Sequence, residues 1–271
     1  MLGAIIGDIA GSRWEFNPTN NYDFQMFSER ENNFTDDTIC TIAVADALIH
    51  RKGFSEALHA WCRRYTCPMG GYGGRFAQWV SSSDPKPYGS YGNGSAMRVS
   101  AVGWAFKDRE SVLAAAEASA ACTHNHPEGI KGAQTVALAI HLGLRLRDKY
   151  AGHTITRKAI REEMIAECVR FSGYDVNIRR EDVMNKFDES CQGTVPVALA
   201  IIAESRSFED AIRRAVSLGA DADTLGAIVG GIAETVWPIP EEMRIRALSY
   251  LPEEMRKVLF EFKEYVKRAK E

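Results

Sequence analysis

The chain has 271 residues, of which 45% are hydrophobic and 25% charged, and its formal net charge is −3. These values are ordinary for a soluble globular protein, and the negative balance argues against a nucleic-acid-binding surface. No apolar run reaches the length of a membrane span, and the first residues lack the pattern of a signal peptide. Six cysteines without a Cys-x-x-Cys pair favour free thiols in a reducing compartment over disulfides or a zinc site. We therefore expect a cytoplasmic protein that binds neither membranes nor nucleic acids.

Apolar residues recur at helical spacing along most of the chain. In chain order, helices are predicted after Asp37, at 55–65, 111–122, 129–146, 156–171, 195–203 and 211–218, after Asp223, and at 252–270. Pro196 is expected in the first turn of its helix, where proline is tolerated. The alternation that is typical of strands does not persist anywhere, and no linker or repeat divides the chain. The sequence predicts one all-α domain covering 1–271, with loops at 69–74, 84–94 and 123–129.

Two short acidic clusters, Thr-Asp-Asp-Thr at 35–38 and Asp-Ala-Asp-Thr at 221–224, are the most informative feature. Helix capping can explain one such cluster, because Asp and Thr oxygens accept hydrogen bonds from free N–H groups at a helix start. Both clusters, however, precede helices that are apolar on all sides, which places their carboxylates near the protein centre or in a cleft. Unpaired charge there is costly unless a cation is bound. Oxygen ligands favour Mg²⁺, Mn²⁺ or Ca²⁺ over zinc, so the clusters predict one shared metal site.

Two glycine-rich loops, at 70–75 and 88–95, combine bare backbone with tyrosine rings. Glycine lets backbone N–H groups approach a ligand closely, and the second loop runs into a predicted helix at Ser95, where a phosphate can bind. Tyr88 or Tyr91 can stack on a nucleobase. A plain cluster of turns explains the same composition. His124 lies in the third loop, where a histidine is more often structural or solvent-exposed than catalytic.

Five motifs occur in a fixed order: 7–16 (Gly-Asp-Ile-Ala-Gly-Ser-Arg-Trp-Glu-Phe), 35–38, 91–98, Thr123-His124 and 219–224. Together they resemble the ADP-ribosylglycohydrolase family, of the dinitrogenase-reductase-activating glycohydrolase and ADP-ribosyl-acceptor hydrolase type. The likeness runs from about residue 3 to about residue 237. It implies a compact orthogonal helical bundle, which agrees with the helical pattern.

The resemblance also implies a centre of two Mg²⁺ or Mn²⁺ ions. By position, the implied metal ligands are Thr35, Asp36, Asp37, Asp221, Asp223 and Thr224. The implied substrate-binding residues are Gly73, Gly89, Ser90, Tyr91, Asn93, Gly94, Met97 and His124. Glu15, after an expected turn at Gly7-Asp8, matches a glutamate near the scissile bond, so Glu15 and Asp36 are the candidate catalytic residues. Nothing in 147–190 matches the family pattern.

The expected function is metal-dependent hydrolysis of the glycosidic bond that joins ADP-ribose to a protein side chain or a small adduct. Two alternatives stay open: another binuclear-metal hydrolase of a nucleotide-like substrate, and a non-catalytic ADP-ribose-binding protein. The expected partner is an ADP-ribosylated protein or an ADP-ribose adduct, bound by a monomer. The acceptor is not revealed, although the stretch 89–94 slightly favours a serine, O-linked acceptor.

Overall fold

The computed structural model describes residues 1–151 and 157–270, and in these residues every named element is a helix. The helices are α1 (Leu2–Gly11), the 3-10 helix η1 (Ser12–Trp14), α2 (Asp36–His50), α3 (Phe54–Arg64), α4 (Gly74–Ser81), α5 (Gly94–Met97), α6 (Ser100–Ala105), α7 (Arg109–Ala121), α8 (Pro127–Lys149), α9 (Arg157–Ser172), α10 (Arg180–Val183), α11 (Cys191–Glu204), α12 (Phe208–Val216), α13 (Ala222–Val236), α14 (Glu241–Tyr250) and α15 (Glu253–Lys270). Within this part of the chain the only β-type pairings are two isolated bridges, Thr35 with Met69 and Gly92 with Ser190. The all-α prediction is confirmed.

The predicted helices occur at the expected places, with bounds that shift by a few residues. Thr156, the expected start of one helix, lies outside the described residues, and that helix is observed from Arg157. The helix expected at 195–203 begins earlier, at Cys191, because the Ser190 side chain caps it by accepting from the Gly193 N–H. The expectation that Pro196 lies in the first turn was therefore wrong, since Pro196 lies inside this helix.

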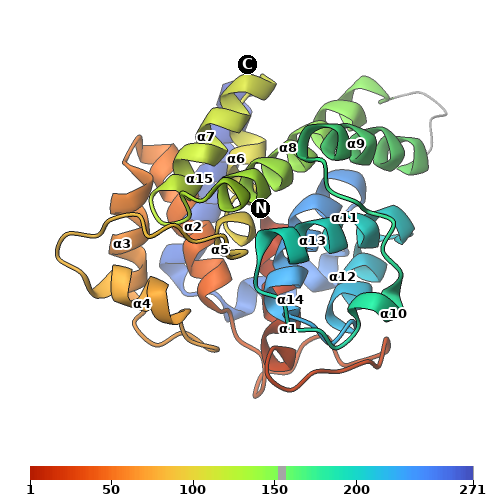
Figure 1. Ribbon diagram of the computed structural model, residues 1–271, viewed down its shortest axis with the longest axis horizontal. Coiled ribbons are helices and arrows are strands. Elements are labelled where there is room, and N and C mark those ends of the chain that lie inside the picture. The colour runs from red at the N-terminus through yellow and green to blue at the C-terminus, as the bar shows by residue number, and fades with distance from the viewer. Residues whose placement is uncertain (152–156, 271) are drawn as a thin grey trace.

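The expected turn at Gly7-Asp8 was also wrong, because both residues lie inside α1. The glycines of α1 serve helix packing instead of a turn. Gly3, Gly7 and Gly11 face Gly230, Gly226 and Ala222 of α13, so the two helices run antiparallel at close range. A Cβ atom added at Gly7 would overlap the backbone of Gly226. This packing brings the C-terminal end of α1 against the N-terminal end of α13 (Figure 1).

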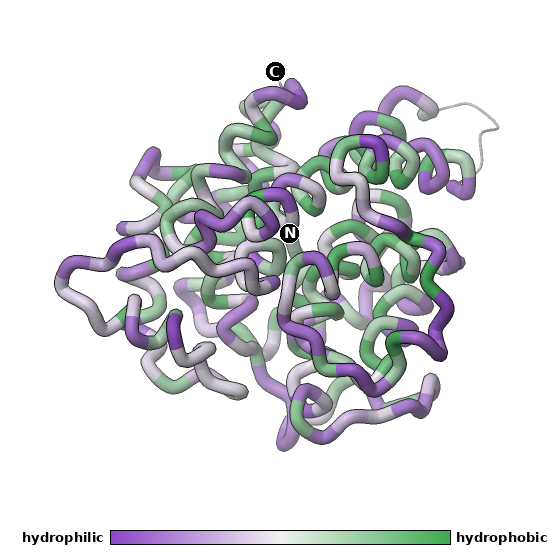
Figure 2. The backbone as a smooth tube through the Cα atoms, in the orientation of Figure 1, coloured by the Kyte–Doolittle hydropathy of each residue, from purple (hydrophilic) through white to green (hydrophobic). Residues whose placement is uncertain are grey.

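The apolar stretches that follow the acidic clusters form α2 and α13, and both helices are buried over nearly their whole length. Figure 2 shows hydrophobic residues gathered on α11, α12 and α13, with hydrophilic residues on the chain that runs outside them between α9 and α11. One continuous hydrophobic cluster joins residues of α1, α2, α8 and α13. Because both helices begin at this core, the carboxylates at their first turns lie deep in the protein. No helix in the described part of the chain combines the length and apolar character needed to cross a bilayer.

Candidate active site

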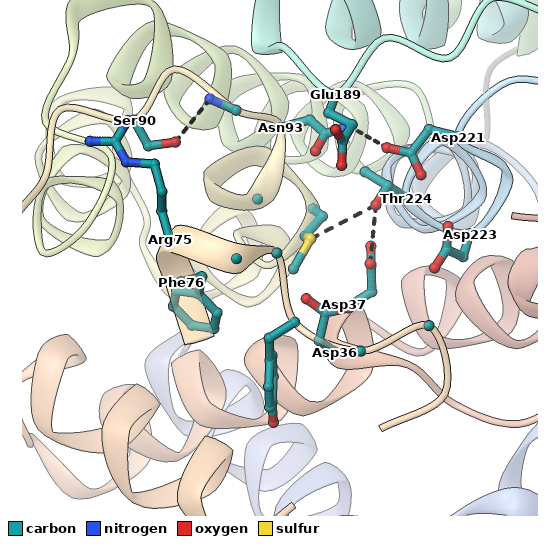
Figure 3. Close-up of a pocket in the computed structure, with 18 of the residues that line it drawn as sticks. Asp36, Asp37, Arg75, Phe76, Ser90, Asn93, Glu189, Asp221, Asp223 and Thr224 are labelled. Carbon is teal, nitrogen blue, oxygen red and sulfur yellow. Dashed lines mark hydrogen bonds between the residues drawn. The ribbon is translucent and has the colours of Figure 1, made fainter. Parts of the chain in front are cut away.

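A cavity of about 430 Å³ lies where the first turns of α2 and α13 meet the glycine-rich loops at 70–75 and 88–94. Figure 3 shows Asp36 and Asp37 on one side of it, Asp221, Asp223 and Thr224 on the next, and Arg75 and Ser90 across from them. Among the residues predicted from sequence, those lining the cavity are Glu15, Asp36, Asp37, Gly73, Ser90, Asn93, Gly94, Met97, His124, Asp221, Asp223 and Thr224. Thr35, Gly89 and Tyr91 are not among the lining residues.

The two acidic clusters are in direct contact although they lie near opposite ends of the sequence. The Thr224 hydroxyl donates a hydrogen bond to Asp37 Oδ2 at 3.1 Å (Figure 3). Thr35 caps α2 by accepting from the Asp37 N–H at 3.2 Å. The capping explanation therefore accounts for the Thr35 hydroxyl, but it leaves the carboxylates of Asp36 and Asp37 without a capping role.

Asp8, in the middle of α1, supports the contact between the acidic clusters by accepting hydrogen bonds from the start of α2. Its Oδ2 accepts from the backbone N–H groups of Thr35 and Thr38 at 3.0 and 3.1 Å, and also from the Thr38 hydroxyl. Its Oδ1 accepts from the Thr35 hydroxyl at 2.8 Å. Burial raises the pKa of Asp8 to about 6, against the lowering effect of these hydrogen bonds. Asp8 thus fixes the direction of the Thr35 hydroxyl and the start of α2.

Three of the carboxylates facing the cavity each have one oxygen without such a partner. Asp37 Oδ1 and Asp223 Oδ1 are buried and have no hydrogen-bond partner, and Glu15 Oε2 is in the same condition. Burial raises the pKa of Asp37 and of Asp223 well above the ordinary range, and the charge of Asp221 adds to the effect. Buried oxygen atoms without donors are costly, because native proteins pair nearly all such atoms. These oxygens are therefore suited to an occupant that brings positive charge.

Glu15 follows η1 and reaches over the acidic cluster. One carboxylate oxygen each from Glu15, Asp221 and Asp223 lie within 4.8 Å of one another. Burial and then the charges of Asp221 and Asp8 raise the pKa of Glu15 to about 7. Gly70 makes room for this side chain, since a Cβ atom at Gly70 would overlap Glu15 Oε2. Arg13, the opposite charge nearest to Glu15 in the sequence, pairs with Glu31 instead.

The end of the cavity away from α13 is basic. Arg98 is 1% exposed and donates to the Ser119 carbonyl and the Thr123 hydroxyl. The Thr123 hydroxyl lies 2.6 Å from His124 Nδ1, and burial together with the charge of Arg98 holds the pKa of His124 well below its ordinary range. His124 is therefore neutral at physiological pH, with one ring nitrogen fixed by Thr123. Arg75 lies over the Tyr88 ring at 4.8 Å.

The second glycine-rich loop is tied to the acidic end through Asn93. The Asn93 side chain donates to Asp221 Oδ2 at 2.7 Å and to the Thr194 hydroxyl at 3.1 Å. Gly94 passes close to His124, whose Nε2 would lie 3.1 Å from a Cβ atom there. Tyr91, by contrast, is 51% exposed and packs beside His126, with ring centroids 5.3 Å apart. Its ring therefore lies at the outer edge of the site.

Sequence reasoning missed several residues of this cavity. Asp8 gave a signal, because it is the only charged residue of the apolar stretch that became α1. Arg98 closes one of the recognised motifs and is among the largest fully buried side chains, but its burial is visible only in the fold. Glu189 lies in the stretch without a recognised pattern, and no local signal distinguishes it.

The donors at the acidic end fit a divalent cation. Carboxylate and hydroxyl oxygens are hard ligands, and nitrogen or sulfur ligands are absent from the three-carboxylate group of Glu15, Asp221 and Asp223. Asp37 Oδ1 and Asp223 Oδ1 have no hydrogen-bond partner, so each acidic cluster has a carboxylate oxygen that is free to bind a cation. The cluster is thus a candidate metal centre.

Comparisons with known proteins agree with this geometry. The ADP-ribosylglycohydrolase family profile matches residues 1–263. ADP-ribosylhydrolase ARH3 of Mus musculus is 26% identical, over 86% of this chain and 81% of its own length. ADP-ribosylarginine hydrolase Tri1 of Pseudomonas putida is 24% identical, over 88% of this chain and 70% of its own. A solved structure described as an ADP-ribosylglycohydrolase-related protein complex has a similar fold, with a TM-score of 0.68 at 23% identity over 98% of this chain and 97% of that one.

The helical fold around an acid-lined cavity and the matched family define an enzyme that hydrolyses glycosyl bonds. More narrowly, the chain belongs to the ADP-ribosylglycohydrolase family, and this membership supports hydrolysis of an ADP-ribose glycosidic bond.

Proposed function

We propose that this enzyme removes ADP-ribose from modified protein side chains or small adducts, and that the reaction depends on two Mg²⁺ or Mn²⁺ ions. The observation that carries the proposal is the pair of buried, unpartnered oxygens on Asp37 and Asp223, one from each acidic cluster. Burial, and then the charges of neighbouring aspartates, raises the pKa of both groups, so their ionised forms are costly without bound cations. An all-oxygen, carboxylate-rich site of this kind is typical of Mg²⁺ and Mn²⁺.

The residues proposed to hold the two ions are Thr35, Asp36, Asp37, Asp221, Asp223 and Thr224. When bound, such ions polarise ribose hydroxyls and make a water molecule more acidic. The hydrogen bond from the Thr35 hydroxyl to Asp8 turns the oxygen lone pairs of Thr35 away from Asp8. The bond from Thr224 to Asp37 likewise sets the orientation of one carboxylate. Asp36 is proposed as a ligand that also orients the attacking water.

Glu15 is proposed to move the proton. Its pKa of about 7 lies near the operating pH, which suits a group that must both give and accept a proton. Its carboxylate lies beside Asp221 and Asp223, so it stands next to the place where the anomeric carbon must be held. The two-carboxylate mechanism of ordinary glycosidases needs no metal and does not explain the additional aspartates.

The basic end of the cavity is proposed to bind the diphosphate and adenosine. Arg75 and Arg98 supply positive charge there, and Gly73 and Gly94, which line the cavity, let backbone N–H groups approach closely. Ser90, Asn93 and Met97 form the wall between this end and the carboxylates. His124 is proposed to donate or accept one hydrogen bond through its free ring nitrogen, and Tyr91 to cover the nucleotide at the outer edge.

We further propose that the chain acts as one domain over 1–271, as a monomer, in the cytoplasm. A non-catalytic ADP-ribose-binding protein is disfavoured, because a binding site alone has no use for six carboxylates around one cavity. Another metal hydrolase of a nucleotide-like substrate remains the competing function.

Release of free ADP-ribose tests the proposal. Arginine-, serine- and nucleobase-linked ADP-ribose are each incubated with the enzyme, with Mg²⁺ and with excess chelator. We expect Mg²⁺-dependent release from at least one linkage. Mg²⁺-dependent hydrolysis of a phosphoester nucleotide with no ADP-ribose release would instead establish the competing function, and release that is equal with chelator would remove the metal requirement.

A further inference from the structure

The chain between α9 and α11, which has no recognised motif, crosses the rim of the cavity and is fixed there. The Asn93 N–H donates to the Glu189 carbonyl at 2.6 Å, and the Cys191 N–H donates to the Tyr91 carbonyl at 2.9 Å. Upstream, the Asn185 N–H donates to the Leu218 carbonyl at 3.0 Å. Asp188 is held as well, because its Oδ1 accepts from the Ser190 N–H. Residues 187–189 therefore have a set position without being part of a helix.

Two phenylalanine rings meet at this rim. Phe16 lines the cavity and is 70% exposed, while Phe187 is 46% exposed. Their ring centroids lie 6.0 Å apart with the planes tilted by 32°. Phe16 directly follows Glu15, so the pair stands beside the proposed proton-transfer group. Large exposed apolar rings that contact one another at a cavity rim are typical of a binding surface, because burial would otherwise be favoured.

An unpaired carboxylate lies at the same rim. Glu189 lines the cavity, and Figure 3 shows its side chain beside Asn93 and Asp221. No salt bridge or side-chain hydrogen bond joins Glu189 to any residue in 1–151 or 157–270. Glu189 is near enough to Glu15 for its negative charge to add, after burial and the charges of Asp221 and Asp8, to the raised pKa of Glu15. The rim thus presents two ring faces and a free negative charge.

The opposite end of the cavity carries Arg75 and Arg98, so the cavity is positive at one end and negative at the other. A substrate whose diphosphate lies at the basic end and whose distal ribose lies at the carboxylates must direct its leaving group toward the rim. Under the proposed function, the rim is then the part of the site that contacts the acceptor.

We propose that Phe16, Phe187 and Glu189 form the acceptor subsite and act as specificity-determining residues that select a planar cation, a guanidinium group. This inference rests on the proposed function. A guanidinium is flat enough to lie on a phenylalanine face and presents paired N–H donors to a carboxylate.

Other acceptors fit this rim less well. A serine side chain is small and neutral, so it leaves the ring faces uncovered and does not neutralise Glu189. A nucleobase can stack on the rings, but it carries no charge to pair with the carboxylate. A lysine ammonium pairs with Glu189 as a point charge, but its geometry does not match a flat ring pair. The rim therefore favours arginine-linked ADP-ribose, whereas the glycine-rich stretch at 89–94 slightly favoured the serine linkage.

Matched peptides test the subsite. One peptide carries ADP-ribose on arginine and the other, otherwise identical, on serine, and kcat/KM for ADP-ribose release is measured on both. The wild type should favour the arginine-linked peptide by at least about tenfold, the effect of one charge-assisted hydrogen bond. Glu189→Gln should reduce this ratio about tenfold, and Phe187→Leu about threefold, while the affinity for free ADP-ribose stays within twofold. Glu181→Gln, an exposed glutamate in α10 of the same segment, is the control and should keep the wild-type ratio.

A binding measurement separates this inference from the proposed reaction. Agmatine, which carries a guanidinium, and putrescine, which carries an amine, are titrated into enzyme saturated with ADP-ribose and Mg²⁺. Agmatine should bind at least about fivefold more tightly than putrescine, and Glu189→Gln should remove the difference. Agmatine binding without hydrolysis of either peptide supports the subsite and overturns the reaction. Hydrolysis with a ratio below one, or with a ratio that Glu189→Gln does not change, overturns the subsite and leaves the reaction in place.

Discussion

Asp8 and Asp37 are buried carboxylates at the same junction, but their surroundings differ in kind. Asp8 is 0% exposed, and both of its oxygens accept hydrogen bonds from Thr35 and Thr38. Asp37 is 2% exposed, and its Oδ1 has no partner, like Oδ1 of Asp223 across the cavity. The first region satisfies negative charge with protein donors, whereas the second leaves it open. We infer that one carboxylate maintains the fold and that the others are reserved for cations.

The largest expected effect comes from removing a carboxylate of the open region. Asp223→Ala or Asp36→Ala should lower kcat/KM for ADP-ribose release by at least about 10³-fold, because several kcal/mol of charge stabilisation would be lost. Steady-state kinetics at saturating Mg²⁺ measure the loss, and circular dichroism checks that the fold is kept. Near-normal rates in both variants would show that the open carboxylates are not part of the reaction.

Glu15→Gln should have the next largest effect. The substitution keeps the shape and hydrogen bonding of the side chain but removes proton transfer, which typically contributes 10²–10⁴-fold, about 3–5 kcal/mol of barrier. We expect a fall of this size in kcat, with affinity for ADP-ribose and for Mn²⁺ retained. Wild-type turnover in this variant would remove Glu15 from the mechanism and assign the proton transfer to an aspartate.

Asp8→Ala tests the satisfied region. The change leaves two buried N–H groups and two hydroxyls without their acceptor, so we expect the free energy of unfolding to fall by about 2–4 kcal/mol in metal-free protein. Asp223→Ala under the same conditions should cost nothing or raise Tm, because it relieves repulsion between like charges. Urea unfolding in chelator compares the two variants. Equal destabilisation by both changes would remove the distinction between the regions.

The pH dependence of stability should change with metal. The pKa values of Glu15 and Asp8 are raised to about 7 and about 6, so in metal-free protein these groups stabilise the fold at low pH. This contribution is fully present below the unfolded pKa values near 4 and is lost as pH rises through 6 and 7. Each titrating group contributes at most about 1.4 kcal/mol per pH unit. The stability gained on adding Mg²⁺ should therefore grow between pH 5 and pH 7.5, as thermal denaturation can measure, and a constant gain would contradict this view.

The smallest expected effects lie away from the carboxylates. Tyr91→Ala should weaken ADP-ribose binding by about 1–3 kcal/mol if its ring stacks on the nucleotide. His124→Ala should weaken it by about 0.5–1.5 kcal/mol through a lost hydrogen bond. Calorimetry with ADP-ribose and with Mn²⁺ should show that only the first ligand is affected. Unchanged ADP-ribose affinity in both variants would mean that the loops at the basic end are structural turns.

The sequence made the fold class predictable, because helical periodicity is local and the stretches that became α2, α8 and α13 carry it clearly. It also singled out both acidic clusters, because the helices that follow them are apolar on all sides. It could not distinguish Asp8 from Asp37, because the difference lies in which donors reach each side chain across the α1–α2 contact. The turn predicted at Gly7-Asp8 was wrong, because glycines that allow close packing of α1 against α13 have the same sequence signature as turn residues. Glu189 and Phe187 could not be predicted as site residues from the sequence, because only the folded path of the chain brings them to the rim of the cavity.

Titration of Mn²⁺ into chelator-stripped protein tests the central claim most directly. If the oxygens of Asp37 and Asp223 are reserved for cations, calorimetry should show saturable binding of two Mn²⁺ ions per chain in the wild type and in the control Glu181→Gln. Asp223→Ala should lose at least one of these sites, and Asp37→Ala should do the same. Wild-type protein that binds no more Mn²⁺ than the Asp37→Ala, Asp223→Ala double variant would contradict the account.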